Sequence, residues 1–271
     1  MEPLADRTAL QRQRARARKS GMVTFLHEAA IAEIQDRVSM VNKSFTDIAI
    51  ITGHPELWRT AFPAAHMLPD EDLLALEPDS QDLVIHAMSL HWAADPIGQL
   101  IQCRRALKPD GLLLAILPGG QSLHALRACL TEAESALRGG LSARILPMGE
   151  LRDMGALLQR AGFALPVADG VPLRAIYPDA LALMRDLRGM GEANALRARP
   201  RRFTPRALFA HAAALYAQNY AAPEGGVEAF YELIVLTGWA PHQSQPQPLR
   251  PGSAQQRLAD ALGARETKLP D

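Results

Sequence analysis

The chain has 271 residues, 48% of them hydrophobic, so it can fill the core of one large or two small domains, and global disorder is excluded. Its 29 lysines and arginines balance 29 aspartates and glutamates, which leaves no basic excess for a phosphate backbone, and nucleic acid is not expected as a partner. The longest apolar run, Leu112 to Leu117, is too short to cross a bilayer and no signal-peptide pattern follows the basic N-terminus, so we expect neither a transmembrane segment nor secretion.

Residues 1–44 are predicted to form an N-terminal helical arm. Apolar residues recur at helical spacing from Arg7 to Val41, which indicates one or two helices. Six basic residues and no acidic one lie between Arg7 and Lys19, both included. We interpret this half of the arm as a solvated helix face, and a tether to an acidic partner or a membrane surface is the alternative.

Residues 45–240 show the pattern of an α/β domain. Short apolar runs bounded by turn-forming residues predict strands at Asp47–Ile51, Ala64–Leu68, Asp82–His86, Leu112–Leu117, Ala164–Ala168, Leu173–Ile176 and Tyr231–Gly238. Apolar residues at helical spacing predict helices at Pro96–Leu107, Ser122–Leu137 and Met148–Ala161. Because strands alternate with helices, we expect a parallel, doubly wound sheet.

A helical insertion is expected at about residues 179–222, before the last strand. Its first helix is predicted at Asp179–Met190, and its second runs to Tyr220 with Thr204 as the N-cap and Pro205 as the first helical residue. Residues 241–271 are rich in Gln, Pro, Ser and Arg, which predicts a polar, proline-rich tail with at most a short helix at Ala254–Leu262.

Several motifs in one order resemble those of an enzyme superfamily. The strand Asp82–His86, the segment Leu90–Trp92 and the LKPDG turn at 107–111 are similar to the fourth and fifth strands of class I S-adenosylmethionine-dependent methyltransferases. Four later motifs resemble one branch of it: GGxxLxxLR at 119–127, DxGxLLxRAGF at 153–163, LMxDLxxMGExN at 183–194 and GWxxHxSQxxPxxxGSA at 238–254.

This branch is the methyltransferase-like complex I assembly factor five family, whose bacterial relatives are often labelled malonyl-carrier-protein methyltransferases of biotin synthesis. The resemblance implies a Rossmann-like class I methyltransferase sheet and S-adenosylmethionine as the cofactor. It also implies a protein partner or substrate, a subunit of the respiratory NADH dehydrogenase, where the eukaryotic relative is associated with arginine hydroxylation. The implied location is cytoplasmic, peripheral at the inner membrane face.

The cofactor-binding half departs from the family pattern. The family's first strand ends in a glycine-rich DLGxGxG loop, because the cofactor needs a close approach of the backbone. The corresponding residues, 48–55, contain only Gly53. Twenty residues separate Ile48 from Leu68, whereas one βαβ unit takes about 30. We therefore match Leu68–Val84 to the family's third strand and expect the second strand, with its ribose-binding acid, to be missing. The cofactor half is then degenerate or shortened, and a site built differently is the alternative.

Four residues are candidates for cofactor binding. Gly53 takes the place of the glycine-rich loop, and Asp70 follows a strand at the position of the acid that holds the adenine. His86 and Leu90 lie near the end of a central strand, where ligands of open α/β sheets bind. The alternative for Asp70 is that it belongs to an acidic surface loop without a ligand. The alternative for His86 is that it is a hydrogen-bonded side chain of the core.

His91, Glu192 and Asn194 are the candidates for catalysis. His91 follows the same strand end, and the other two lie on a segment expected to cap the pocket. The alternative for that segment is a helix terminus with Gly191 as the breaker. We expect the three side chains to line one cleft at the carboxyl edge of the sheet. Neither the histidines nor the two cysteines show metal-ligand spacing, so no metal site is predicted.

Three functions are compatible with the sequence. The first is an S-adenosylmethionine-dependent methyltransferase acting on a carboxyl or protein group. The second is an assembly factor acting on a subunit of the respiratory NADH dehydrogenase, and the third is a pseudo-enzyme that retains the fold as a binding module. The absence of further glycines at Thr52–Glu56 lowers the expected affinity for S-adenosylmethionine and favours the second and third functions.

Overall fold

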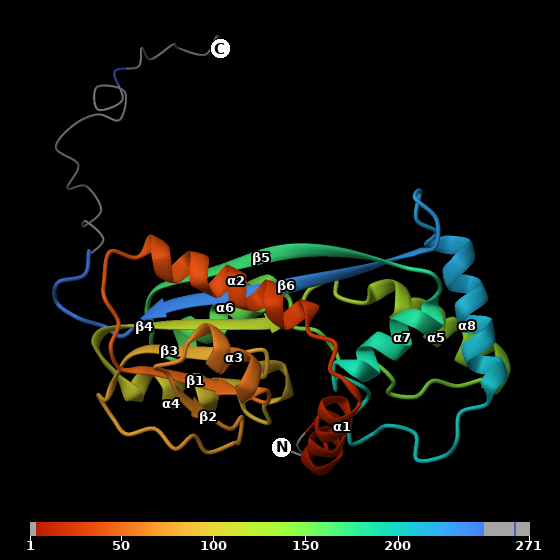
Figure 1. The fold of residues 1–271 in the computed structure, drawn as a ribbon, viewed down its shortest axis with the longest axis horizontal. Coiled ribbons are helices and arrows are strands. Elements are labelled where there is room, and N and C mark those ends of the chain that lie inside the picture. Colours follow the sequence, from red (N-terminus) through yellow and green to blue (C-terminus); the bar gives the residue numbers. More distant parts are fainter. Residues whose placement is uncertain (1–3, 247–262, 264–271) are drawn as a thin grey trace, which may run out of the picture. The chain divides into compact units, whose positions relative to one another are not determined.

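The computed structural model describes residues 4–246 and residue 263, in two units that divide between Pro241 and His242. The first unit contains a six-stranded sheet of order β2-β1-β3-β4-β6-β5 (Figure 1). Its strands are β1 (Ile48–Thr52), β2 (His66–Leu68), β3 (Gln81–Ala87), β4 (Leu107–Pro118), β5 (Ala164–Tyr177) and β6 (Val227–Trp239). The first four strands are parallel, whereas β6 is antiparallel to both β4 and β5. The predicted α/β class is confirmed, and the sheet is mixed rather than parallel throughout.

Helices pack against both faces of the sheet. One core cluster joins the sheet to α2 (Phe25–Met40), α3 (Pro55–Ala61), α5 (His124–Arg138), α7 (Ala180–Gly189) and α8 (Arg206–Asn219), and a second joins it to α4 (Pro96–Ala106) and α6 (Leu151–Arg160). In β4, Leu112 and Leu114 belong to the first cluster, and Leu113 and Leu117 to the second. A run of apolar residues without polar alternation is typical of a strand that is buried on both faces.

The edge of the sheet next to β1 is short. β2 pairs directly with β1 in a parallel register that sets Leu68 beside Ile51. The crossover between these strands contains only the seven-residue helix α3. In doubly wound sheets the second strand adjoins the first, so residues matched by sequence to a third strand occupy the place of a second one.

The N-terminal residues form two helices, α1 (Arg7–Ser20) and α2. They are separated at Gly21, whose φ of 84° suits a residue without a side chain. α2 is part of the α/β core, in which its Leu26, Ala30 and Ile34 are buried. The hydrophobic spacing that indicated one or two helices therefore corresponds to two, and the second of them packs on the sheet.

α1 is held by a small apolar cluster of its own. Leu10 is fully buried there and belongs to the same cluster as Trp92 and Leu196. The interpretation of α1 as a solvated face holds for Arg12, which is exposed, but it is wrong for Arg14, which is 3% exposed. Helical spacing sets Arg14 on the side of Leu10 and Ala17, but it does not show the partners of Arg14, which come from distant segments.

Two local predictions are wrong. The two strands predicted at 164–168 and 173–176 form one strand, β5, which runs through Gly170 and Pro172. β5 is an edge strand, where the missing N–H of a proline interrupts no central ladder. Thr204 does not cap α8, because Pro205 is the N-cap residue and the Thr204 hydroxyl accepts a hydrogen bond from Arg144.

The second unit is described at residues 242–246 and 263. The backbone N–H of Gln245 donates to the carbonyl of His242 over 3.2 Å and closes a turn. The helix predicted at Ala254–Leu262 lies outside the described residues, as does the end of the GWxxHxSQxxPxxxGSA motif. Within the described part of the chain, no helix combines the length and the apolarity that a bilayer crossing requires.

Candidate functional site

Two concave regions lie at the carboxyl edge of the parallel strands, the usual place for ligands in this architecture. The first is a cavity of about 330 Å³, here called the Glu192 cavity, whose lining includes Met88 after β3 and Pro118 at the end of β4. The second, called the Gly53 depression, has a volume of about 600 Å³, and its lining includes Gly53 after β1 and Asp70 after β2.

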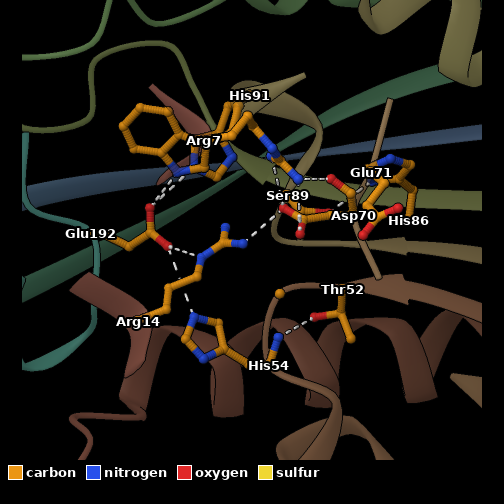
Figure 2. Close-up of polar contacts among 12 residues, drawn as sticks. Arg7, Arg14, Thr52, His54, Asp70, Glu71, His86, Ser89, His91 and Glu192 are labelled. Carbon is orange, nitrogen blue, oxygen red and sulfur yellow. Dashed lines mark hydrogen bonds and ion pairs between the residues drawn. The ribbon is translucent and has the colours of Figure 1, made fainter. Parts of the chain in front are cut away.

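Arg14 of α1 connects one residue of each region (Figure 2). Its Nη1 donates to Oδ2 of Asp70 over 2.8 Å, and its Nε lies 3.6 Å from Oε1 of Glu192. Only 4% of the side chain is exposed. Burial disfavours the charged guanidinium, but the two carboxylates more than compensate for it and raise the pKa of Arg14. The arginine therefore carries a buried positive charge.

Glu192 is the acceptor on which several groups converge. The indole Nε1 of Trp92 donates to its Oε2 over 2.5 Å, and Nε2 of His91 lies 3.5 Å from the same oxygen (Figure 2). Burial disfavours the carboxylate, but the hydrogen bond from His91 and the charge of Arg14 hold the pKa of Glu192 well below its usual range. Glu192 thus presents a carboxylate to the cavity at neutral pH.

Two glycines make room for α1. A Cβ at Gly53 would lie 2.0 Å from Nη1 of Arg14, and one at Gly191 would lie 3.0 Å from the Cα of Arg14. Gly191 also has a φ of 80° just after α7, which favours glycine and turns the chain toward Glu192. The one glycine of the loop after β1 therefore accommodates a guanidinium of the protein itself.

Asp70, a predicted cofactor contact, is held by two arginines of α1. Besides Arg14, Nη2 of Arg7 lies 3.3 Å from its Oδ1, and Arg7 also donates to its main-chain carbonyl. Asp70 is 8% exposed. Its carboxylate is thus committed to partners within the chain.

Two buried histidines lie beside this ion network. The ring centroids of His27 and His54 are 4.9 Å apart, and the indole Nε1 of Trp58 donates to Nδ1 of His27 over 3.3 Å. Neither ring nitrogen of His54 has a hydrogen-bond partner among the described residues, and its Nε2 lies 4.0 Å from Glu192. Burial lowers the pKa of His27 to about 3 and that of His54 to about 4, so both rings are neutral at pH 7.

His86 and Leu90, the other two cofactor candidates, lie in the core. His86 is fully buried, with its Nε2 2.8 Å from Oε1 of Gln99 and its Nδ1 3.3 Å from Oγ of Ser89. Burial lowers the pKa of His86 to about 4. Leu90 is 1% exposed and belongs to the second core cluster. Neither residue lines the Glu192 cavity or the Gly53 depression.

The three catalytic candidates are brought together, because His91, Glu192 and Asn194 all line the Glu192 cavity. The side chain of Asn194 is used locally: its Nδ2 donates to the carbonyl of Ala143 over 2.7 Å, and its Oδ1 accepts from the N–H of Leu196 over 3.0 Å. The Nδ1 atom of His91 has no hydrogen-bond partner among the described residues. An imidazole and a carboxylate are therefore the polar groups best placed to meet a bound molecule.

Sequence reasoning missed Arg14, His27 and His54. A signal for Arg14 was present, because Leu10, Arg14 and Ala17 follow one another at helical spacing and all three are buried. The two histidines carried no such signal, since each is isolated in sequence and is brought to the site by the packing of α2 on β1 and α3.

The comparisons with known proteins concern the family and the fold. Residues 56–115 match the family model of a methyltransferase domain. The chain is 37% identical over 198 residues to the mitochondrial arginine-hydroxylase NDUFAF5 of Danio rerio, covering 73% of this chain and 61% of that protein. It is 38% identical over 195 residues to the mitochondrial arginine-hydroxylase NDUFAF5 of Homo sapiens, covering 72% and 56%. The chain thus spans less than two thirds of the length of these relatives.

A malonyl-[acyl-carrier protein] O-methyltransferase of Laribacter hongkongensis is 31% identical over 216 residues, covering 79% of this chain and 69% of that protein.

Among solved structures, the YcgJ protein of Bacillus subtilis has a TM-score of 0.51 at 10% identity, covering 80% of this chain and all of that one. A Bacillus halodurans protein assigned as a methyltransferase has a TM-score of 0.50 at 12% identity, covering 78% and 99%. At these identities the structural likeness concerns the fold alone. The family model and the sequence relatives show that the chain belongs to the class I S-adenosylmethionine-dependent methyltransferase superfamily and is similar to the NDUFAF5 proteins.

Proposed function

We propose that this protein is a methyltransferase-fold assembly factor that binds a subunit of the respiratory NADH dehydrogenase and has weak or no affinity for S-adenosylmethionine. One observation carries the proposal: the guanidinium of Arg14 lies against Gly53 and is paired with Asp70. These are the two residues that the family resemblance sets against the cofactor.

The residues around Gly53 do not suit S-adenosylmethionine. Arg14, Arg18 and Arg59 line the Gly53 depression, and their charges oppose the positive sulfonium of the cofactor. Asp70, which the resemblance sets at the position of the acid that holds the adenine, is already paired with arginines. The loop supplies one glycine, so the close backbone approach that the family loop provides is also lacking. These features support a binding role without methyl transfer.

The Glu192 cavity is the proposed site for a side chain of the partner subunit. Its lining includes Tyr231 together with Glu192, whose carboxylate is contacted by Trp92 and His91. Arg144 and Arg188 also line it, and Arg144 is paired with Glu134. A carboxylate next to aromatic rings attracts a cationic group. The NDUFAF5 relatives are named arginine-hydroxylases. An arginine of the partner is therefore the proposed occupant, with Glu192 and His91 as its binding residues.

The cofactor part of the proposal is tested by calorimetric titration of the purified chain with S-adenosylmethionine. We expect a dissociation constant in the millimolar range or weaker, about −4 kcal/mol. A dissociation constant in the low micromolar range, about −8 kcal/mol, would contradict the assignment of Arg14 as the occupant of the site. An active methyltransferase titrated under the same conditions is the positive control.

The partner part is tested in the source organism by deleting the gene and restoring it on a plasmid. We expect deletion to lower the amount of assembled respiratory NADH dehydrogenase, and the unchanged gene to restore it. A Glu192→Gln variant should not restore it, because the neutral amide loses the attraction for a cation. Glu132→Gln, at an exposed position on α5, is the matched control and should restore assembly. Full restoration by Glu192→Gln would overturn the proposed site.

A further inference from the structure

The positive charges that line the Gly53 depression are not all paired. Arg14 is paired with the carboxylate of Asp70, whereas Arg18 and Arg59 are exposed and form no ion pair with any described residue. Glu56, which is also exposed, supplies the remaining acid of the lining. Three arginines thus stand against two acids around the depression, and two of the arginines are free to meet an anion.

The two free arginines come from different helices. Arg18 lies one turn after Arg14 on α1, so both project from the same face of that helix. The Nη1 atom of Arg18 donates to the carbonyl of Gly53 over 3.4 Å, which holds the side chain beside the loop after β1. Arg59 belongs to α3, the helix that follows this loop. Both arginines therefore meet at the carboxyl end of β1, where ligands of this architecture bind.

A buried histidine of the same lining lacks hydrogen-bond partners. His54 is 2% exposed, and neither of its ring nitrogens has a hydrogen-bond partner among the described residues. Its ring lies next to the guanidinium of Arg14, whose Nη2 also lacks such a partner (Figure 2). A buried polar group without a hydrogen bond is costly, and a neutral imidazole has one N–H to donate. A ligand with acceptor oxygens would satisfy donors that the chain itself leaves unsatisfied.

The depression also offers apolar contacts. Met22, Leu57 and Met67 line it and are half-buried. Its volume of about 600 Å³ exceeds what a single inorganic ion fills. An anionic group on a carbon body would use the arginines and the apolar side chains together.

We propose that the Gly53 depression binds a small organic phosphate. Arg18 and Arg59 match the two negative charges of a phosphate monoester, and together with His54 they offer N–H groups from three segments to its three terminal oxygens. A carboxylate has one charge and two oxygens, so it matches this set of donors less well. The inference goes beyond the proposed function, whose partner-binding site is the Glu192 cavity.

Calorimetric titration of the full chain with phenyl phosphate tests the proposal, with inorganic phosphate, benzoate and phenol as comparison ligands. We expect a submillimolar dissociation constant for phenyl phosphate, weaker binding of inorganic phosphate and benzoate, and no binding of phenol. Added salt should weaken the binding, because it screens exposed charges. Arg18→Gln and Arg59→Gln should each weaken it about fivefold, and Glu56→Gln should strengthen it, because that change removes a negative charge from the lining.

The matched control carries Arg12→Gln and Arg16→Gln, at two exposed positions of α1 outside the lining, and removes the same charge as Arg18→Gln combined with Arg59→Gln. It should bind phenyl phosphate like the unchanged chain. All variants should keep the melting temperature, because the substituted side chains are exposed. Equal losses in the control and the combined variant would overturn the proposal. So would the absence of phenyl phosphate binding, or an equal affinity for any of the comparison ligands. None of these outcomes bears on the titration with S-adenosylmethionine or on the restoration of assembly by the gene.

Discussion

Arg14 carries a buried positive charge between the Gly53 depression and the Glu192 cavity. On a helix it would be solvated by default, yet it is 4% exposed and lies between the carboxylates of Asp70 and Glu192. A buried charge is stable only when its partners are in place, and removing one member leaves the others uncompensated. The stability of the fold and the state of the site are therefore coupled at this residue.

Replacing Arg14 by methionine is expected to destabilise the protein by about 3 kcal/mol, because Glu192 loses a buried cationic partner. Arg12→Met, on the exposed side of the same helix, should change the free energy of unfolding by no more than about 0.5 kcal/mol. Urea denaturation of both variants measures the difference. Equal effects of the two substitutions would mean that the ion network contributes little to folding.

The buried histidines predict a dependence of stability on pH. The folded pKa of His54 is about 4, below the unfolded value of about 6.5, so between these values the unfolded chain binds a proton that the native chain does not. The contribution of such a histidine to the free energy of unfolding is fully present above about pH 6.5. It falls by about 1.4 kcal/mol per pH unit as the pH is lowered toward about 4. His27 and His86 add to the same trend.

His54→Leu should reduce this slope by the share of one histidine, because the apolar side chain has no proton to gain. The measurement is the free energy of unfolding by urea at several pH values between about 4.5 and about 7. His66→Leu is the control, since it makes the same substitution at an exposed position. An unchanged slope in His54→Leu would show that the His54 ring titrates normally in the folded chain.

Among the elements, α1 makes its apolar contacts outside the two clusters that hold the sheet. Its Leu10 belongs to a small separate cluster, and polar contacts supply much of the rest: the buried ion pair of Arg14 with Asp70 and the half-buried contacts of Arg7 and Gln13. β4, by contrast, lies between two strands and is buried on both faces. Elements with few buried contacts open at lower free energy than the whole fold.

We therefore expect the backbone amides of α1 to exchange with deuterium before those of β4. Hydrogen exchange read by mass spectrometry on peptides from Arg7–Ser20 and Leu107–Pro118 gives the comparison. Arg14→Met should accelerate exchange in α1, because opening of the helix then no longer breaks the ion pairs of Arg14. Protection of α1 equal to that of β4 would instead make this helix part of the cooperative core.

The elements also show which predictions a single sequence supports. Strands β1 and β3 and the Leu112–Leu117 part of β4 were predictable because each is an apolar run next to turn-forming residues, and so was α4. The LKPDG segment, predicted as a turn, is the first part of β4. The continuity of β5 was not, because Gly170 and Pro172 indicate a break unless the strand is known to lie at an edge. Edge position is a property of the assembled sheet.

The candidate site likewise has features that the sequence predicts and features that depend on the assembled fold. The gathering of His91, Glu192 and Asn194 in one cavity follows from topology, since segments after parallel strands meet at one edge. The pairing of Arg14 with Asp70 spans 56 residues and depends on how α1 docks. Helical periodicity places a residue on a face but does not say what that face meets.

At the scale of the whole molecule, positive and negative charges cancel, with a pI of ≈ 7.1. Five arginines and no acidic residue lie between Ala193 and Pro223, so a neutral chain carries the compensating negative charge elsewhere. This charge asymmetry orients the molecule in an electric field. Neutral proteins with such an asymmetry attract one another at low salt.

We expect the solubility of the purified protein at low ionic strength to be lowest near its pI and to rise when salt screens the attraction. The saturating concentration, measured across about one pH unit on either side of neutrality with and without added salt, provides the test. Arg202→Glu with Arg206→Glu should raise solubility at neutral pH, because it replaces two exposed positive charges by negative ones and gives the chain a net negative charge. Solubility that falls steadily across this pH range would contradict the expectation.

The contact between Arg14 and Gly53 also bears on which substitutions a site for S-adenosylmethionine would require in this chain. With the arginine in place, position 53 tolerates no side chain, and Gly191 is restricted by the same helix. In the proposed function the guanidinium takes the place of the cofactor, so adding glycines around position 53 leaves it there, and removing Arg14 leaves a loop with one glycine and a crossover that contains the seven-residue helix α3. On that proposal neither step alone restores a cofactor site, so the substitutions that restore one have to occur together.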